Sequence, residues 1–173
     1  MEVVRPAGVE DANAIAGIHV RSWQAAYRGL IPDDVLDGLS VERRTETWRG
    51  WLATASPVAV WVAEEEGGRI VGFVSAGPLE DRDAAEIQAI YVEPDRSGRG
   101  IGRALLRRAV DELRAGGHAE VVLWVLDGND RAQRFYEAAG WRADGGAKVE
   151  AMEGVDLSQV RYRLSLAAGP TER

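Results

Sequence analysis

The segment from Ile87 to Arg108 reads IQAIYVEPDRSGRGIGRALLRR. It begins with a run of strand-forming residues, continues through a short loop and ends in a glycine-rich turn that opens a helical pattern. The first N–H groups of a helix have no acceptor within the helix, and the helix dipole adds partial positive charge there. The segment therefore predicts a strand–loop–helix unit that binds a phosphate or pyrophosphate group.

Two common phosphate-binding loops do not fit these glycines. A Walker A loop ends in Gly-Lys-Ser/Thr, whereas Gly102 is followed by Arg103 and Ala104. A dinucleotide fingerprint needs a small residue three places after its second glycine. Counted from Gly100 and Gly102, that place is Leu105. Both classes of nucleotide-binding loop are therefore excluded.

The composition predicts one globular domain. The chain has 173 residues, of which 46% are hydrophobic and 28% charged, as in ordinary globular proteins. Its net charge of −7 argues against a nucleic-acid partner, which needs a basic face. The absence of cysteine excludes disulfides, thiolate metal sites and a cysteine nucleophile. Two dispersed histidines without an acidic cluster give no support for a metal site.

The first residues lack a basic stretch followed by an apolar core, so no signal peptide is expected. No apolar run approaches the roughly 20 residues that span a bilayer. We therefore expect a cytoplasmic protein without a membrane partner.

Before residue 55 the chain has mainly helical patterns. Trp23 and Tyr27 recur at helical spacing, and Ser40 is a suitable N-cap for a later helix. The expected elements are a strand over 2–5 and helices over 11–27, over 32–38 and from 41 onward.

After Pro57 the pattern changes to strands, with a βαβ unit in the middle. The chain is predicted to be a mixed α/β (α+β) fold of one domain, 1–167, followed by a mobile tail, 168–173. It is not a doubly wound dinucleotide fold, which would alternate strand and helix throughout. The expected elements are strands over 58–63, 70–76, 86–92, 121–126, 141–149 and 160–166, with helices over 100–115 and 129–140 and a polar loop between the last two strands.

Two motifs together resemble those of the GNAT superfamily of acyl-coenzyme A-dependent N-acyltransferases. SGRGIGRALL resembles that family's pyrophosphate loop, Gln/Arg-x-x-Gly-x-Gly/Ala. Gly100 and Gly102 match, whereas the first position is Ser97 and the nearest arginine, Arg96, lies one place early. NDRAQRFYEAAGW resembles the family's downstream Asn-x-x-Ala…Phe-Tyr-Glu…Gly-Phe/Trp segment. The matching residues there are Asn129, Ala132, Tyr136, Glu137 and Gly140.

The resemblance implies a fold and an activity. The expected fold is a central, mostly antiparallel sheet with a splayed parallel strand pair and helices on both faces. The expected activity is N-acetyl transfer from acetyl-CoA to a primary amine by direct attack in a ternary complex, since no nucleophile for a covalent intermediate is evident. No metal is expected. The acceptor, a small molecule or a protein N-terminus or lysine, stays open, as does a homodimer. A non-catalytic acyl-CoA-binding sensor or assembly module of the same fold is the alternative.

The resemblance also assigns coenzyme contacts. The strand before the loop would pair its main chain with the pantetheine arm, and one N–H would polarise the thioester carbonyl. The loop amides would cradle the pyrophosphate, whereas its arginines also suit a solvated helix face. The expected coenzyme-binding residues are Ile90, Tyr91, Val92, Gly98, Arg99, Gly100, Ile101, Gly102, Arg103, Asn129 and Tyr136.

Two residues are candidates for proton transfer. By resemblance, Tyr136 would donate a proton to the departing thiolate, although an aromatic beside Phe135 also suits a core position. Glu86 would take a proton from the incoming ammonium ion, and a period of two places it on one strand face with Gln88. A surface carboxylate at a strand edge is the alternative for Glu86.

The candidates for binding the acceptor are Trp23, Tyr27, Glu86 and Trp124. In the family the early helices lie over the acceptor pocket, so Trp23 and Tyr27 would wall it. The same aromatic stripe also suits core packing. Trp124 lies five residues before Asn129, where some relatives carry a glutamate instead.

Overall fold

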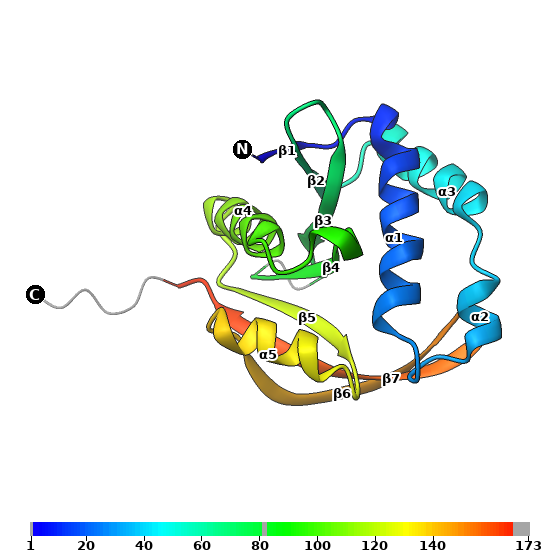
Figure 1. Ribbon diagram of the computed structural model, residues 1–173. Coiled ribbons are helices and arrows are strands. Elements are labelled where there is room, and N and C mark those ends of the chain that lie inside the picture. Colours follow the sequence, from blue (N-terminus) through cyan, green and yellow to red (C-terminus); the bar gives the residue numbers. More distant parts are fainter. Residues whose placement is uncertain (1, 81–82, 168–173) are drawn as a thin grey trace, which may run out of the picture.

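The computed structural model describes residues 2–80 and 83–167, and the tail predicted over 168–173 lies outside the described residues. The strands form a seven-stranded sheet in the order β1-β2-β3-β4-β5-β7-β6 (Figure 1). Among the strands of the described residues, only β4 and β5 are parallel neighbours. The predicted mixed, mostly antiparallel sheet is therefore confirmed. The strands are β1 Val3–Pro6, β2 Ala59–Glu64, β3 Ile70–Pro78, β4 Ala84–Val92, β5 Glu120–Leu126, β6 Arg142–Met152 and β7 Val155–Ser165.

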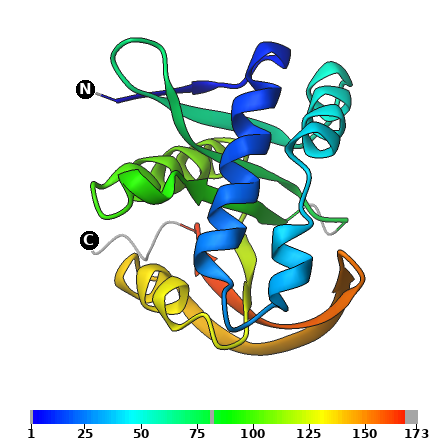
Figure 2. The ribbon, with the colours of Figure 1, turned by 45° about the vertical axis from the view of Figure 1, so that its right-hand side comes forward.

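Helices cover both faces of the sheet, as the resemblance implied (Figures 1 and 2). On one face, Leu105 of α4 and Tyr136 of α5 pack in one apolar cluster. On the other, α1 and α3 bury Ile15 and Trp48 against Phe73 of β3. The helices are α1 Ala12–Ala26, α2 Asp33–Asp37, α3 Val41–Ala53, α4 Ile101–Ala115 and α5 Asp130–Ala138, with 3-10 turns η1 Val9–Asp11 and η2 Pro94–Arg96.

The parallel pair β4–β5 is joined over only part of its length. Residues Ala84 to Ile87 pair with Glu120 to Leu123, and the pairing ends there. Beyond that point each strand continues beside its other neighbour, β3 or β7. The sheet therefore contains an internal gap between the C-terminal halves of β4 and β5, which is the splayed pair that the resemblance predicted.

A β-bulge shapes the β4 side of this gap. Ile87 lies opposite Ala76 of β3, whereas Ala89 lies opposite Ser75, so Gln88 is an extra residue in β4. A bulge bends its strand and increases the local twist. It accounts for the divergence of β4 from β5 directly after their last paired residues.

The bulge also changes which side chains face each helical layer. Ile87 packs in the cluster under α4, and so does Ile90, three residues later. Tyr91 consequently packs toward α1 and α3. If side chains alternated strictly from Glu86 onward, Ile90 would face α1 and α3, and Tyr91 would face α4.

The polar loop predicted between the last two strands is wrong. Residues 142–165 form a long hairpin with only Glu153 and Gly154 at its turn, both at positive φ, the backbone of a type I′ hairpin turn. Near this turn, Leu157 packs with Trp23 and Leu36, from α1 and α2. Burial of these apolar groups outweighs the polar character of the sequence, and the hairpin extends past β5 to the end of α1 (Figure 1).

No helix within 2–80 and 83–167 combines the length and the apolar character needed to cross a membrane.

Candidate active site

The gap between β4 and β5 opens into a cavity of about 540 Å³. Its walls come from the last turn of α1, the ends of both strands, the glycine-rich loop and α5. Every residue predicted to bind coenzyme lines this cavity except Arg99, which is exposed outside it. The sequence segment from 87 to 108 and the helix after Asn129 therefore form one site.

The glycine-rich loop presents free N–H groups to the cavity. Gly98 and Gly100 have φ of 79° and 87°, a region in which only glycine is unstrained. The first hydrogen bond of α4 runs from Ala104 N to Gly100 O, 3.0 Å. The N–H groups of residues 101–103 have no acceptor in the described part of the chain, and no side chain caps the helix.

The surface around these N–H groups suits an anion. A Cβ on Gly102 would lie 3.5 Å from Phe135 and 3.6 Å from Val92, which is ordinary contact, so packing inside the protein does not require glycine there. Arg103 and Arg131 line the same cavity, and no Asp or Glu does so among the described residues. A pyrophosphate fits this donor set.

Arg96, the arginine nearest to the first motif position, has its charge already paired. It donates to Glu65 at 2.6 Å and to Asp95 at 3.0 Å. Arg96 and Ser97 both line the cavity. The departure from the motif therefore leaves an arginine at the cavity whose charge is paired with Glu65 and Asp95, and it does not change the backbone N–H groups.

Tyr136 lies on α5 with its ring against Phe135 and Trp141. It is 8% exposed and lines the cavity, and its hydroxyl has no hydrogen-bond partner within the described residues. Burial, and next the nearby Tyr91 hydroxyl, raise the pKa of Tyr136 above its usual value. The group stays protonated at neutral pH and can act as a proton donor.

Asn129 caps α5, as the sequence predicted. Its side chain accepts a hydrogen bond from Ala132 N at 3.2 Å, and it lies at the edge of the cavity. This cap fixes the start of the helix that carries Tyr136.

Glu86 lies in the paired half of β4, opposite Gly77 of β3 and Val122 of β5. It is partly buried, and it does not line the cavity, although Gln88 does. Burial raises the pKa of Glu86; Lys148 lowers it and Glu150 raises it further. A partly buried carboxylate with a raised pKa is a better base near neutral pH than an exposed one.

The structure separates the four residues predicted to bind the acceptor. Tyr27 and Trp124 line the cavity, and Glu86 and Trp23 do not. Trp23 is 3% exposed and packs in the core with Leu36. Its Nε1 donates to the Tyr91 hydroxyl at 2.9 Å, so it positions a cavity residue.

Sequence reasoning missed the Tyr91 side chain, which was expected to contribute only main-chain groups. Its hydroxyl lies 3.2 Å from that of Tyr27. Because the bulge at Gln88 sets the orientation of Tyr91, the strand pattern alone could not place it. Arg131 was also missed, although its place in the Asn129 motif was a usable signal.

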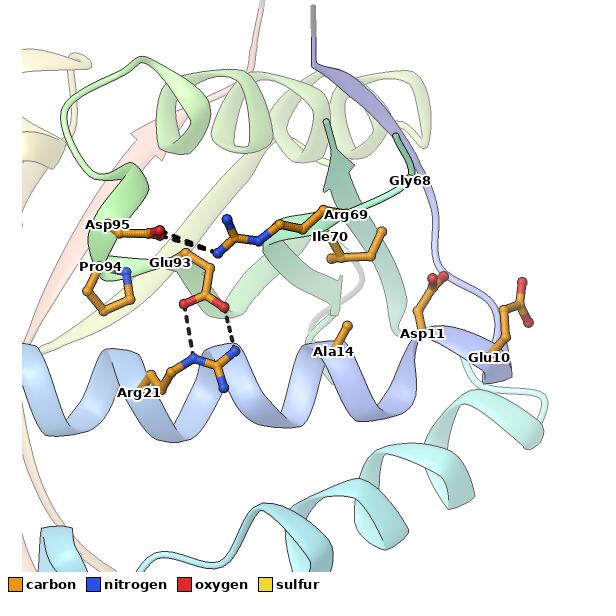
Figure 3. A pocket seen from close by; sticks show the side chains of 10 residues that line it. All are labelled: Glu10, Asp11, Ala14, Arg21, Gly68, Arg69, Ile70, Glu93, Pro94 and Asp95. Atoms are coloured by element: carbon orange, nitrogen blue, oxygen red, sulfur yellow. Dashed lines mark hydrogen bonds and ion pairs between the residues drawn. The ribbon is translucent and has the colours of Figure 1, made fainter. Parts of the chain in front are cut away.

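A second hollow, of about 690 Å³, is lined by η1, by Ala14 and Arg21 of α1, by the start of β3 and by the turn that follows β4. Four of its charged side chains form two pairs: Arg21 donates to Glu93, and Arg69 lies 3.5 Å from Asp95 (Figure 3). This hollow is lined neither by the first residues of α4, with their free N–H groups, nor by Tyr136. We place the reaction in the gap for that reason.

Residues 2–80 and 83–167 bring together no group of three or more His, Cys, Asp or Glu side chains that could hold a metal ion.

Comparisons with known proteins agree on one class. An uncharacterised N-acetyltransferase of Bacillus subtilis, YuaI, is 35% identical over 141 residues, which are 80% of this chain and 79% of that protein. A mycothiol acetyltransferase of Clavibacter sepedonicus is 35% identical over 79% of this chain and 44% of its own length. These relatives place the chain in the class of acetyl-CoA-dependent acetyltransferases.

Solved structures show the same fold. PaiA N-acetyltransferase of Thermoplasma acidophilum in complex with coenzyme A has a TM-score of 0.74 at 20% identity, over 95% of this chain and 99% of that one. YncA of Salmonella typhimurium with acetyl-CoA has a TM-score of 0.71 at 23% identity, over 100% of this chain and 98% of that one. Residues 20–141 match the model of the Acetyltransferase (GNAT) family. The chain belongs to this family.

Proposed function

We propose that this N-acetyltransferase moves the acetyl group of acetyl-CoA directly to a primary amine within a ternary complex in the β4–β5 gap. The observation that carries the proposal is that the free N–H groups at the start of α4 and the unpaired hydroxyl of Tyr136 line the same cavity. One end suits an anionic coenzyme, and the other offers a proton donor.

The coenzyme would lie along the gap. Residues 98–103 would hold its pyrophosphate through main-chain N–H groups, and the unpaired half of β4 would pair with the pantetheine arm. The carbonyl of Val92 already accepts a hydrogen bond from the Ser22 hydroxyl at 3.1 Å, so other main-chain groups would make that contact. Bound acetyl-CoA supplies a thioester carbonyl, the electrophile of the reaction.

Two side chains would move the protons. Glu86, acting through water because it does not line the cavity, would take one proton from the ammonium ion. The freed nitrogen attacks the carbonyl carbon, a C–N bond forms and the C–S bond breaks. Tyr136 gives its proton to the leaving sulfur and regains one from the attacking nitrogen. The products are the acetamide, the coenzyme thiol and one proton released to solvent. Holding both reactants in one cavity contributes to the rate by proximity.

Replacement of Tyr136 tests this assignment. In Tyr136→Phe we expect turnover to fall by roughly 10²-fold, the usual contribution of a general acid, because the sulfur would leave as an unprotonated thiolate. Coenzyme affinity should stay within about threefold, since the ring and its packing remain. Thiol release gives turnover, and titration with coenzyme A gives affinity.

Tyr162→Phe is the matched control, because the Tyr162 hydroxyl bonds to Glu137 at 2.9 Å and lies outside the cavity. Its turnover should not change. An unchanged turnover in Tyr136→Phe would remove Tyr136 from the mechanism. Tight coenzyme binding without acetylation of any amine in a panel would contradict the proposed function and support the binding-module alternative.

A further inference from the structure

Three hydrogen-bond donors meet beside the cavity that Tyr136 also lines. Trp23 Nε1 can only donate, and it donates to the Tyr91 hydroxyl at 2.9 Å. The hydroxyls of Tyr27 and Tyr91 share one further hydrogen bond, 3.2 Å long. The group thus contains three donor hydrogens, and its two internal bonds use two of them.

One hydroxyl hydrogen is therefore left over, whichever way the shared bond points. If Tyr27 donates to Tyr91, the hydrogen of Tyr91 is free, and in the reverse case that of Tyr27 is free. Neither hydroxyl has another partner among residues 2–80 and 83–167, and both residues line the cavity. The pair offers one donor to whatever binds there.

This donor stays protonated. Burial raises the pKa of both Tyr27 and Tyr91 above the usual phenol value. The two hydroxyls therefore do not act as bases near neutral pH. They can recognise an oxygen that accepts a hydrogen bond. A second ammonium group has no lone pair, so it could only donate to a tyrosine oxygen and would leave the remaining hydroxyl hydrogen without an acceptor.

The charges around the cavity do not suit a polycation. No described carboxylate lines the cavity. Lys148 and Arg161 lie over the ring of Trp124, 4.7 and 5.6 Å from its centroid. Carboxylates on the same strands already bind these cations, at 2.9 Å in Lys148–Glu150 and 2.8 Å in Arg161–Asp144. Additional ammonium groups on an acceptor would be desolvated without a counterion, which is costly.

We infer that the acceptor is an α-amino carbonyl compound, with a primary amine beside a carbon that carries a carbonyl or carboxylate oxygen. Its amine would face Tyr136, and its oxygen would accept the remaining hydrogen of the Tyr27–Tyr91 pair. Free amino acids and peptide N-termini share this chemistry, whereas polyamines and aminoglycosides lack it. The inference rests on the proposed function and specifies its acceptor.

The test uses two amines that differ in the oxygen-bearing group. Leucinamide carries the carboxamide and 3-methylbutylamine does not. The pKa values of the two amines also differ. We therefore compare the ratio of their kcat/KM values in the variant with the same ratio in the unmodified protein, because the pKa difference contributes equally to both ratios. In the double variant Tyr27→Phe/Tyr91→Phe we expect the ratio to fall by about tenfold, the effect of one hydrogen bond. In Tyr162→Phe the ratio should not change.

The double variant lacks the Tyr91 hydroxyl that accepts the hydrogen bond of Trp23. If it does not fold for that reason, a second measurement on the unmodified protein still tests the inference. The acetylated products, N-acetylleucinamide and N-(3-methylbutyl)acetamide, are both uncharged. As product inhibitors, the first should bind about tenfold more tightly. N-acetylleucine, compared in the same assay, distinguishes a carboxylate-bearing amino acid from a peptide-like acceptor.

Equal inhibition by the two uncharged products, or an unchanged ratio in a folded double variant, would overturn the inference. A higher kcat/KM for spermidine than for leucinamide would also overturn it and would leave the proposed function intact. Absence of acetylation with every amine would overturn the proposed function itself, and this inference with it.

Discussion

Gly102 and Gly50 are both helical glycines, but only Gly102 borders the cavity. A Cβ on Gly102 meets Phe135 at ordinary contact distance, 3.5 Å, and a Cβ on Gly50 of α3 meets nothing within 4 Å. We expect Gly102→Ala to lower coenzyme A affinity by about tenfold or more, because its methyl group lies beside the free N–H groups. Its stability should stay the same or rise by up to about 1 kcal/mol.

Gly50→Ala is the control for this prediction. It should raise stability by a similar amount and leave coenzyme affinity unchanged. Titration with coenzyme A and chemical denaturation measure the two quantities. Normal affinity in Gly102→Ala would show that a methyl group at this position does not obstruct coenzyme binding.

His19 predicts a pH dependence of stability. Its Nδ1 accepts from Trp48 Nε1 at 3.3 Å, and burial, with a smaller effect of Arg44, lowers the pKa of His19 to about 3. The unfolded chain binds a proton below pH 6.5, while the folded chain binds it only near pH 3. Stability is therefore fully present above pH 6.5 and declines below it, by about 2 kcal/mol at pH 5 from this group.

Urea unfolding at pH 7.5 and pH 5 checks this expectation. The same experiment on His19→Gln, which keeps an acceptor for Trp48, isolates the contribution of His19 from that of the carboxylates. An equal loss of stability in both proteins would show that His19 does not titrate as described.

Individual residues of the candidate site can be predicted where a motif fixes them. Tyr136 and Asn129 lie where the resemblance put them, at the cavity. Trp23 could not be distinguished from a wall residue, because helical spacing identifies a buried stripe and not what covers it. The side chain of Tyr91 depends on the bulge at Gln88, a feature of strand pairing that a single strand's sequence does not show.

At the scale of elements, ion pairs hold the η2 turn that precedes the glycine-rich loop. Glu93 accepts from Arg21 of α1, Asp95 pairs with Arg69 at the start of β3, and Arg96 donates to Glu65 in the β2–β3 connection. Glu93 is only 5% exposed. Helix α1 and the β2–β3 connection therefore fix the position of the turn that precedes the phosphate-binding N–H groups.

This arrangement predicts an effect on coenzyme binding without direct contact. We expect Glu93→Ala to weaken coenzyme A binding several-fold, because the turn loses its anchor on α1 and the loop must be ordered on binding. Turnover at saturating coenzyme should change less than affinity. Glu46→Ala, which breaks the exposed pair with Arg49, should alter neither quantity. Equal coenzyme affinity in the two variants would show that the ion pairs do not position the loop.

Most element boundaries followed from local signals, and the β6–β7 hairpin did not. Helix caps at Ser40 and Asn129 marked real helix starts. The sequence of residues 150–159 predicts a polar loop. In the structure, however, alternate apolar side chains of this segment, such as Leu157, pack against α2. Long-range burial decided that segment, and it cannot be read from neighbouring residues.

Across the whole molecule, the sheet consists of two parts joined by the short parallel pairing of β4 and β5. A coenzyme that pairs with both strands would connect these parts. We expect saturating coenzyme A to slow hydrogen exchange at amides within 88–92 and 124–126 and to raise the melting temperature. At 100 times the dissociation constant the added stability is about 2.7 kcal/mol.

The amides of α3 are the internal control for the exchange experiment, because α3 does not line the cavity. Their exchange should follow only the change in global stability. Protection that spreads evenly over the molecule, without a larger effect at the gap, would contradict pairing of the coenzyme with β4.

The gap gives this sheet an edge in its interior. Exposed strand edges invite pairing with other proteins and aggregation, and folds normally shorten or cover them. Here unpaired β4 and β5 backbone lies between α1 and α5, at the wall of a cavity of about 540 Å³. A polypeptide with side chains on alternate faces would collide with these helices, whereas a slender extended arm would not. The fold can thus keep main-chain groups permanently unpaired for a ligand without exposing them as a template for self-association.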